Sequence, residues 1–211
     1  MCGLTGFIHS SNGEHRKPEL ERVIEKMTST LALRGPDSKG IFIDKKIALG
    51  HRRLKIIDLS DNGSQPMQVR ENGPVIAYNG EVYNFQLLKN ELSLLGHSFR
   101  GNSDTEVILH VYDEWGFDGL KRLEGIFAYA LWDPSIDRLM LMRDRLGVKP
   151  IFYADSSMGL VFGSEIKSLL AAGGVDTSLN DQAFSEYLWY GNAYEDRSFY
   201  NGVKALLPGQ C

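Results

Sequence analysis

Residues 125–164 are dominated by short apolar segments separated by polar turns. The segments read GIFAYALWD, RLMLMRD, PIFYAD and LVFGS, and each has the length of a strand. The run IFAYALW is continuously apolar instead of alternating, a pattern typical of strands covered on both faces. A fold that accepts such strands needs packing layers on both sides of a sheet.

The rest of the chain mixes further strands with blocks of helix. Other strands are predicted at 2–9, 40–44, 47–51, 66–70 and 74–78. Helices are predicted from Pro18 to near Gly35, from Phe85 to Leu95 with Asn84 as N-cap, at 104–115 after a capping box (Ser103 to Glu106), and at 165–172 and 180–189. Strand clusters mixed with helices predict an α+β layered domain and not a regular βαβ repeat.

The composition excludes several functional classes. The 211 residues suit one sizeable domain or one domain with a tail, and a net charge of −4 provides no footprint for nucleic acid. No apolar run approaches the roughly 20 residues that span a membrane, and no secretion signal opens the chain. The two cysteines lie at opposite ends and make a poor disulfide framework, so the cytoplasm is the expected location.

The sequence predicts neither a metal site nor a nucleotide site. Its five histidines are scattered, with no HxxxH pair and no CxxC. It contains no GxGxxG and no Walker-type loop. The expected chemistry is therefore carried by side chains without a metal.

Cys2 is the first candidate nucleophile. Removal of Met1 would give one residue both a thiol and a free α-amine. Their reference pKa values are about 8.5 and about 7.7–8.0, so the amine can accept the thiol's proton near neutrality and no histidine is needed. The alternative is an incidental cysteine in a first strand.

Asn79 and Gly80 are candidates for an oxyanion hole. An asparagine amide and the adjacent glycine N–H can both direct donors at a developing oxyanion. The alternative is a hairpin turn, because Asn-Gly between apolar runs is a strong hairpin signal, and taken alone it favours the hairpin. The two interpretations are compatible.

Two charged residues are candidates for holding a free amino acid. Arg53 could grip a carboxylate through its planar guanidinium, although Arg52 has an equal claim on spacing. Asp104 could accept hydrogen bonds from an ammonium group. The alternatives are a surface arginine and an ordinary first-turn acid favoured by the helix dipole.

Three further segments are interpreted structurally. Residues 34–37 (RGPD) are predicted to be a turn that closes the first helix, and residues 143–147 (RDRLG) a strand-to-loop corner. The segment from about 176 is rich in aromatic residues, which usually pack on something. We interpret it as a connector toward a second domain.

The ordered segments MCGLTGF, RGPDSKG, HRRLKIID, YNGEVYN, GNSDTEVI, GIFAYALWD and RDRLGVKPIFY closely resemble the glutaminase domain of glutamine-hydrolysing asparagine synthetases. These are class II glutamine amidotransferases of the N-terminal-nucleophile hydrolase superfamily. The resemblance runs from Met1 to about Leu170. It implies a four-layer αββα sandwich with two antiparallel sheets between helices, a glutaminase domain over 1–175 and a connector over 176–211.

The resemblance also implies a role for each candidate residue. Cys2, freed from Met1, would attack the side-chain amide of glutamine, and Asn79 and Gly80 match the oxyanion-hole pair. Arg53 matches the residue that binds the α-carboxylate and Asp104 the acid that holds the α-amino group. Glu81 would lie beside the substrate and contact it through its backbone. A chain that retains Met1 is expected to be inactive.

In the resembled family a C-terminal domain uses ATP and magnesium and carries an SGGxDS loop, which this sequence lacks. The chain by itself is therefore expected to need no cofactor, to hydrolyse glutamine and to make no amide, as a fragment or beside a separate synthetase. The expected partners are L-glutamine, a C-terminal or separate synthetase domain and, in a homodimer, a second copy. Open alternatives are a different acceptor from aspartate and a non-catalytic glutamine-binding module.

Overall fold

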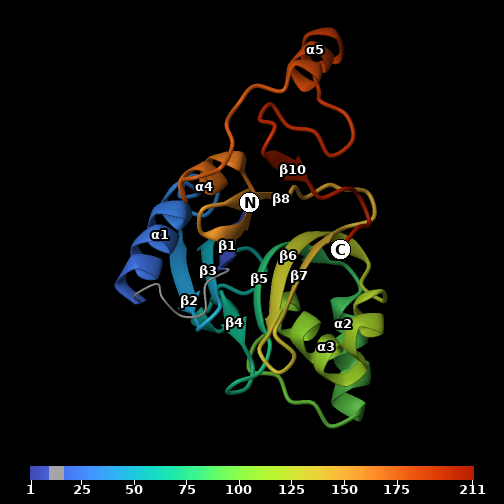
Figure 1. Ribbon diagram of the computed structural model, residues 1–211. Helices are drawn as coiled ribbons and strands as arrows, with labels where there is room; N and C mark the ends of the chain where they lie inside the picture. The colour runs from blue at the N-terminus through green and yellow to red at the C-terminus, as the bar shows by residue number, and fades with distance from the viewer. Residues whose placement is uncertain (10–16) are drawn as a thin grey trace.

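The computed structural model describes residues 1–9 and 17–211, which contain two antiparallel sheets (Figure 1). The six-stranded sheet has the spatial order β10 (Val203–Ala205), β8 (Phe152–Ser156), β9 (Gly159–Gly163), β1 (Gly3–His9), β3 (Ile47–Arg53) and β2 (Ser38–Ile43). The four-stranded sheet has the order β4 (Met67–Gln68), β5 (Val75–Val82), β6 (Gly125–Asp133) and β7 (Arg138–Arg143). Each predicted strand is confirmed, although β4 is shorter than the predicted 66–70 and β5 extends beyond the predicted 74–78 to Val82; β10 was not predicted.

Helices cover the outer faces of both sheets. α1 (Lys17–Ser29) and α4 (Ile166–Leu170) pack on the six-stranded sheet, and α2 (Phe85–Leu94) and α3 (Asp104–Leu120) pack on the four-stranded sheet. A short 3₁₀ helix, η1, spans Asp61–Gly63. α5 (Asp181–Tyr190) lies apart from these layers, at the top of Figure 1.

The buried apolar side chains form three clusters that define the layers. One cluster joins α1 and α4 to the six-stranded sheet, one lies between the sheets, and one joins the four-stranded sheet to α2 and α3. In β6, Ala128, Ala130 and Trp132 face the other sheet, whereas Tyr129 and Leu131 face the helices. The continuously apolar run is therefore buried on both faces, as predicted, and the layers are helix, sheet, sheet and helix.

The first helix ends earlier than predicted, at Ser29 instead of near Gly35. The next residues form tight turns in which Leu31 N–H donates to the Thr28 carbonyl at 3.1 Å. The chain turns here because it must pass close to β3: a Cβ on Gly35 would lie 2.2 Å from the backbone carbon of Arg52. Leu31 remains buried, so its apolar spacing was a packing signal and not a helix signal.

The hairpin alternative for Asn79-Gly80 is wrong. Both residues lie inside β5, where Asn79 pairs with Ala128 and Gly80 with Phe127. The strand continues through Val82 because β6 supplies a partner along its whole length. A Cβ at position 80 would lie 2.2 Å from the Ile126 carbonyl oxygen, so the glycine serves a close approach of two strands.

Candidate active site

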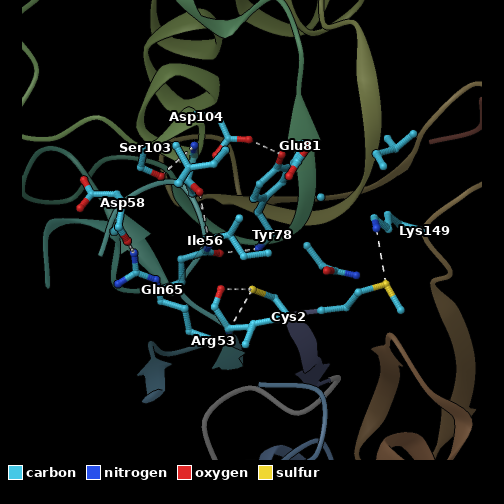
Figure 2. A pocket seen from close by; sticks show the side chains of 18 residues that line it. Cys2, Arg53, Ile56, Asp58, Gln65, Tyr78, Glu81, Ser103, Asp104 and Lys149 are labelled. Atoms are coloured by element: carbon cyan, nitrogen blue, oxygen red, sulfur yellow. Dashed lines mark hydrogen bonds between the residues drawn. The ribbon is translucent and has the colours of Figure 1, made fainter. Parts of the chain in front are cut away.

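All six candidate residues line one small cavity of about 150 Å³ (Figure 2). It lies where the start of β1, the end of β3, the C-terminal half of β5 and the first turn of α3 meet. The structure thus brings together residues spread over half the chain: Cys2, Arg53, Asn79, Gly80, Glu81 and Asp104.

The thiol of Cys2 is held at the entrance to β1. Its Sγ accepts a hydrogen bond from Leu54 N–H at 3.3 Å and lies 3.6 Å from the Leu54 carbonyl oxygen (Figure 2). Burial raises the pKa of this thiol, while the Leu54 N–H, the chain-terminal charge and Arg53 act in the opposite direction. The surroundings that favour the thiolate therefore come from two separate parts of the chain, its N-terminus and residues 53–54.

Arg34 fixes the backbone of the same cysteine. Its Nε donates to the Cys2 carbonyl oxygen at 2.9 Å, and its Nη1 bonds Glu165 at 3.0 Å. The RGPD segment was predicted to be only a turn. The structure shows that it also anchors the residue that carries the thiol, a contact that no local sequence pattern announces because 32 residues separate the partners.

Asn79 provides an unpaired donor in the cavity wall. Its side chain is buried, and its Nδ2 has no hydrogen-bond partner within residues 1–9 and 17–211. A buried amide without a partner costs about 1–3 kcal/mol, so this Nδ2 is available to a ligand that supplies an acceptor. Val75 and Ala77 of β5 face the other sheet. Because side chains alternate along a strand, Asn79 lies on the same face.

The structure selects Arg53 over Arg52, which does not line the cavity. Arg53 is buried, and its guanidinium donates to the carbonyl oxygens of Ser60 at 2.7 Å and of Asp58. Its Nη2 would lie 2.0 Å from a Cβ on Gly63, so the guanidinium packs directly on that glycine. The loop after β3 therefore fixes the plane of the guanidinium while other N–H groups remain for a ligand.

Asp104 is the first residue of α3, and one half of the predicted capping box is present at this helix start. Ser103 is the N-cap, its Oγ accepting from Thr105 N–H at 3.1 Å. The reciprocal half of the capping box is wrong: the Glu106 carboxylate accepts from the N–H groups of Arg100 and Gly101 at 2.8 and 3.0 Å. It thereby ties the preceding loop to the helix.

Two residues that the sequence analysis missed orient this carboxylate. Asp104 Oδ2 accepts from Tyr78 Oη at 2.6 Å and from Val82 N–H at 3.0 Å. Burial raises the pKa of Asp104, and these two hydrogen bonds oppose the rise. Gln65 in turn bridges β5 and α3, accepting from Tyr78 N–H at 2.7 Å and donating to Thr105 Oγ1 at 3.2 Å. The sequence contains one signal for these supporting residues, namely that Tyr78 directly precedes Asn79-Gly80.

The cavity carries charged side chains of both signs. Within the described residues, no group of three His, Cys, Asp or Glu side chains could hold a metal ion. Nor does that part of the chain contain a helix long and apolar enough to cross a membrane. A guanidinium and a carboxylate instead stand at the same cavity as a thiol.

Comparisons with known proteins show the family of the chain. The sequence matches the family described as "Glutamine amidotransferase domain" over residues 1–211. It is 38% identical to glutamine-hydrolyzing asparagine synthetase 3 of Bacillus subtilis, covering 100% of this chain and 34% of the relative. It is 35% identical to the amidase chry2 of Gibberella zeae, covering 99% and 32%. The chain spans about a third of the length of these curated relatives.

The solved structure of glutamine phosphoribosylpyrophosphate amidotransferase from B. subtilis superposes with a TM-score of 0.67 at 18% identity, covering 98% of this chain and 49% of that one. Facing antiparallel sheets, outer helices and a cysteine at the start of a central strand define the N-terminal-nucleophile hydrolase fold. The chain belongs to the glutamine amidotransferase domain family, and it matches the glutaminase half of asparagine synthetases.

Proposed function

We propose that this chain hydrolyses L-glutamine to glutamate and ammonia through a γ-glutamyl thioester on Cys2. One observation carries the proposal: a thiol, an unpaired buried amide, a buried arginine and a buried aspartate line the same small cavity. The family match over the whole chain supports the same reaction.

Substrate recognition follows from the charges. The Arg53 guanidinium pairs with the α-carboxylate and the Asp104 carboxylate with the α-ammonium group, so a free amino acid satisfies both. Glu81 contacts the substrate through its backbone beside them. These interactions orient the side-chain amide of glutamine toward Cys2, which converts a bimolecular attack into a positioned one.

The chemistry needs only groups of this chain. Once Met1 is removed, the α-amine of Cys2 takes the thiol proton and Sγ attacks the amide carbon. The oxyanion accepts hydrogen bonds from Asn79 Nδ2 and Gly80 N–H. The protonated amine then gives its proton to the leaving nitrogen, ammonia departs and the thioester remains. Water attacks the thioester with the amine as base, releasing glutamate and restoring the thiol.

In the longer protein we propose that the ammonia serves ATP-dependent asparagine synthesis from aspartate. The names of the B. subtilis relatives support this acceptor, and the name of the chry2 amidase keeps another acceptor open. On this proposal residues 1–175 form the glutaminase unit, residues 176–211 connect it to a synthetase domain that uses ATP and magnesium, and the protein acts in the cytoplasm as a homodimer.

The test combines turnover with covalent trapping. The chain without Met1 should release glutamate and ammonia in equal amounts from glutamine, and diazo-oxo-norleucine should add to Cys2 while leaving Cys211 unmodified, because both thiols are free but only Cys2 lies in the cavity. Peptide mass spectrometry locates the adduct. Glutamine binding without glutamate release, or an adduct confined to Cys211, would contradict the proposal.

Replacing Tyr78 with Phe should weaken glutamine binding at low pH. The change removes a hydrogen bond that lowers the pKa of Asp104, so the carboxylate takes up its proton at a higher pH. The rise in KM on acidification should begin about one pH unit higher than in the parent, with kcat nearly unchanged. Tyr129→Phe is the control, since that buried hydroxyl bonds Met142. Equal KM profiles in both variants would exclude this role.

A further inference from the structure

The corner after β7, residues 143–149, is held by two charged side chains. The buried Asp144 carboxylate accepts backbone hydrogen bonds from Phe127, Leu146, Val148 and Lys149 at 3.0–3.2 Å. The Arg143 guanidinium donates to the carbonyl oxygens of Lys149, Leu206 and Gly147 at 3.1, 2.6 and 2.5 Å. Both backbone polar groups of Lys149 are thus fixed, its N–H by Asp144 and its C=O by Arg143.

This corner presents the side chain of Lys149 to the active-site cavity. Lys149 lines the cavity, and its Nζ lies 3.5 Å from the Sδ of Met1, the residue joined to the Cys2 nitrogen (Figure 2). The thioether is its hydrogen-bond partner, and no carboxylate of residues 1–9 and 17–211 forms an ion pair with it. The ammonium therefore lies in the same cavity as Cys2, against the side chain of the residue whose removal uncovers the Cys2 amine.

We propose that Lys149 is a positioning residue whose charge shifts loss of a proton from the α-amine of Cys2, and from its thiol, to lower pH. A like charge nearby disfavours the ammonium form of the amine, and an opposite charge favours the thiolate. The amine can act as a base only when unprotonated, so the first effect extends the active form to lower pH. The second effect eases release of the thiol proton and offsets the lower basicity of the amine. The inference rests on the proposed glutamine hydrolysis and adds a residue to it.

Other charges face Cys2 from each element packed around it. Arg53 at the end of β3 lowers the pKa of the Cys2 thiol, and Asp104 at the start of α3 raises it. Glu81 of β5 lines the same cavity. Arg34 bonds the Cys2 carbonyl, but Glu165 neutralises its guanidinium. Lys149 is distinct in this set because, within the described part of the chain, its ammonium contacts neither a carboxylate nor a backbone carbonyl.

The test is the pH profile of Lys149→Met, with Lys149→Gln as a second neutral variant. Each protein is used after mass spectrometry shows that Met1 is gone. The acidic limb of the kcat/KM profile reports the pKa of the base in the free enzyme. In both variants this limb should move about one pH unit higher. The value of kcat/KM should then fall about tenfold at pH values below the limb and stay near the parental value above it. Lys149→Arg should restore the limb. Lys45→Met, at an exposed turn lysine, is the control.

A second readout does not depend on turnover. The pH midpoint of Cys2 alkylation by iodoacetamide, followed by peptide mass spectrometry, should rise by about one unit in Lys149→Met and stay put in Lys149→Arg. An unchanged midpoint and limb would overturn the role of Lys149, and so would a KM increase that is equal at all pH values. Failure of the parent to release glutamate would instead refute the proposed reaction, leaving the alkylation result to judge Lys149.

Discussion

Replacing Cys2 with Ala should reduce glutamate release to background while the protein stays folded. The variant loses the only nucleophile that the proposed mechanism uses, and no thioester can form. The side chain is only partly buried, and its hydrogen bonds are weak sulfur contacts with Leu54. Glutamate release should therefore fall by the full measurable range, whereas the thermal midpoint should shift by only a few degrees.

Cys211→Ala is the matched control, because Cys211 is the second free cysteine and is exposed. It should retain parental turnover. Isothermal titration of Cys2→Ala with glutamine separates binding from chemistry, since Arg53 and Asp104 remain in place to hold the substrate. Residual turnover in a preparation shown by mass spectrometry to carry alanine would sink the assignment of the nucleophile.

Replacing Asn79 with Ala should lower kcat by about 10²–10³-fold with little change in KM. Loss of one oxyanion donor typically costs about 3–4 kcal/mol of transition-state stabilisation, and the donor acts after the substrate is bound. The free energy of unfolding should not fall in parallel with kcat. The Asn79 amide nitrogen has no partner among the described residues, so its removal breaks no hydrogen bond and eliminates an unpaired buried donor.

Single-turnover measurements with denaturant unfolding check both halves of this prediction. Asn90→Ala, on the exposed side of α2, controls for the loss of an asparagine and should leave kcat unchanged. A proportional fall of kcat and unfolding free energy in Asn79→Ala would show that the residue is needed for folding and not for the oxyanion. A loss confined to KM would place it in ground-state binding.

Part of the site was predictable because its residues are marked by local chemistry. Cys2 stands next to the initiator methionine, and Asp104 follows an N-cap serine, so a nucleophile and a helix-terminal acid could be named from their neighbours. Their roles came from the resemblance to a family. Arg53 and Arg52 could not be separated by spacing, and the choice required the structure, in which only Arg53 borders the cavity.

The residues that support the site could not be predicted in this way. Tyr78 reaches Asp104 across 26 positions, and Arg34 reaches Cys2 across 32. Lys149 meets Met1 across 148 positions. Such contacts depend on which strands pair and in which register, and a one-residue slip of β5 would exchange the faces of Tyr78 and Asn79.

The amino-acid pattern alone determined the element types, the two-faced burial of β6 and the position of the nucleophile, because apolar periodicity and the chemistry of a terminal cysteine are local properties. Only the tertiary structure decided that Asn79-Gly80 continues a strand, that the first helix ends at Ser29, and that the corner after β7 places Lys149 at the cavity, against the Met1 side chain. Those outcomes depend on packing between distant segments, where a strand partner or a close backbone approach overrides a local preference.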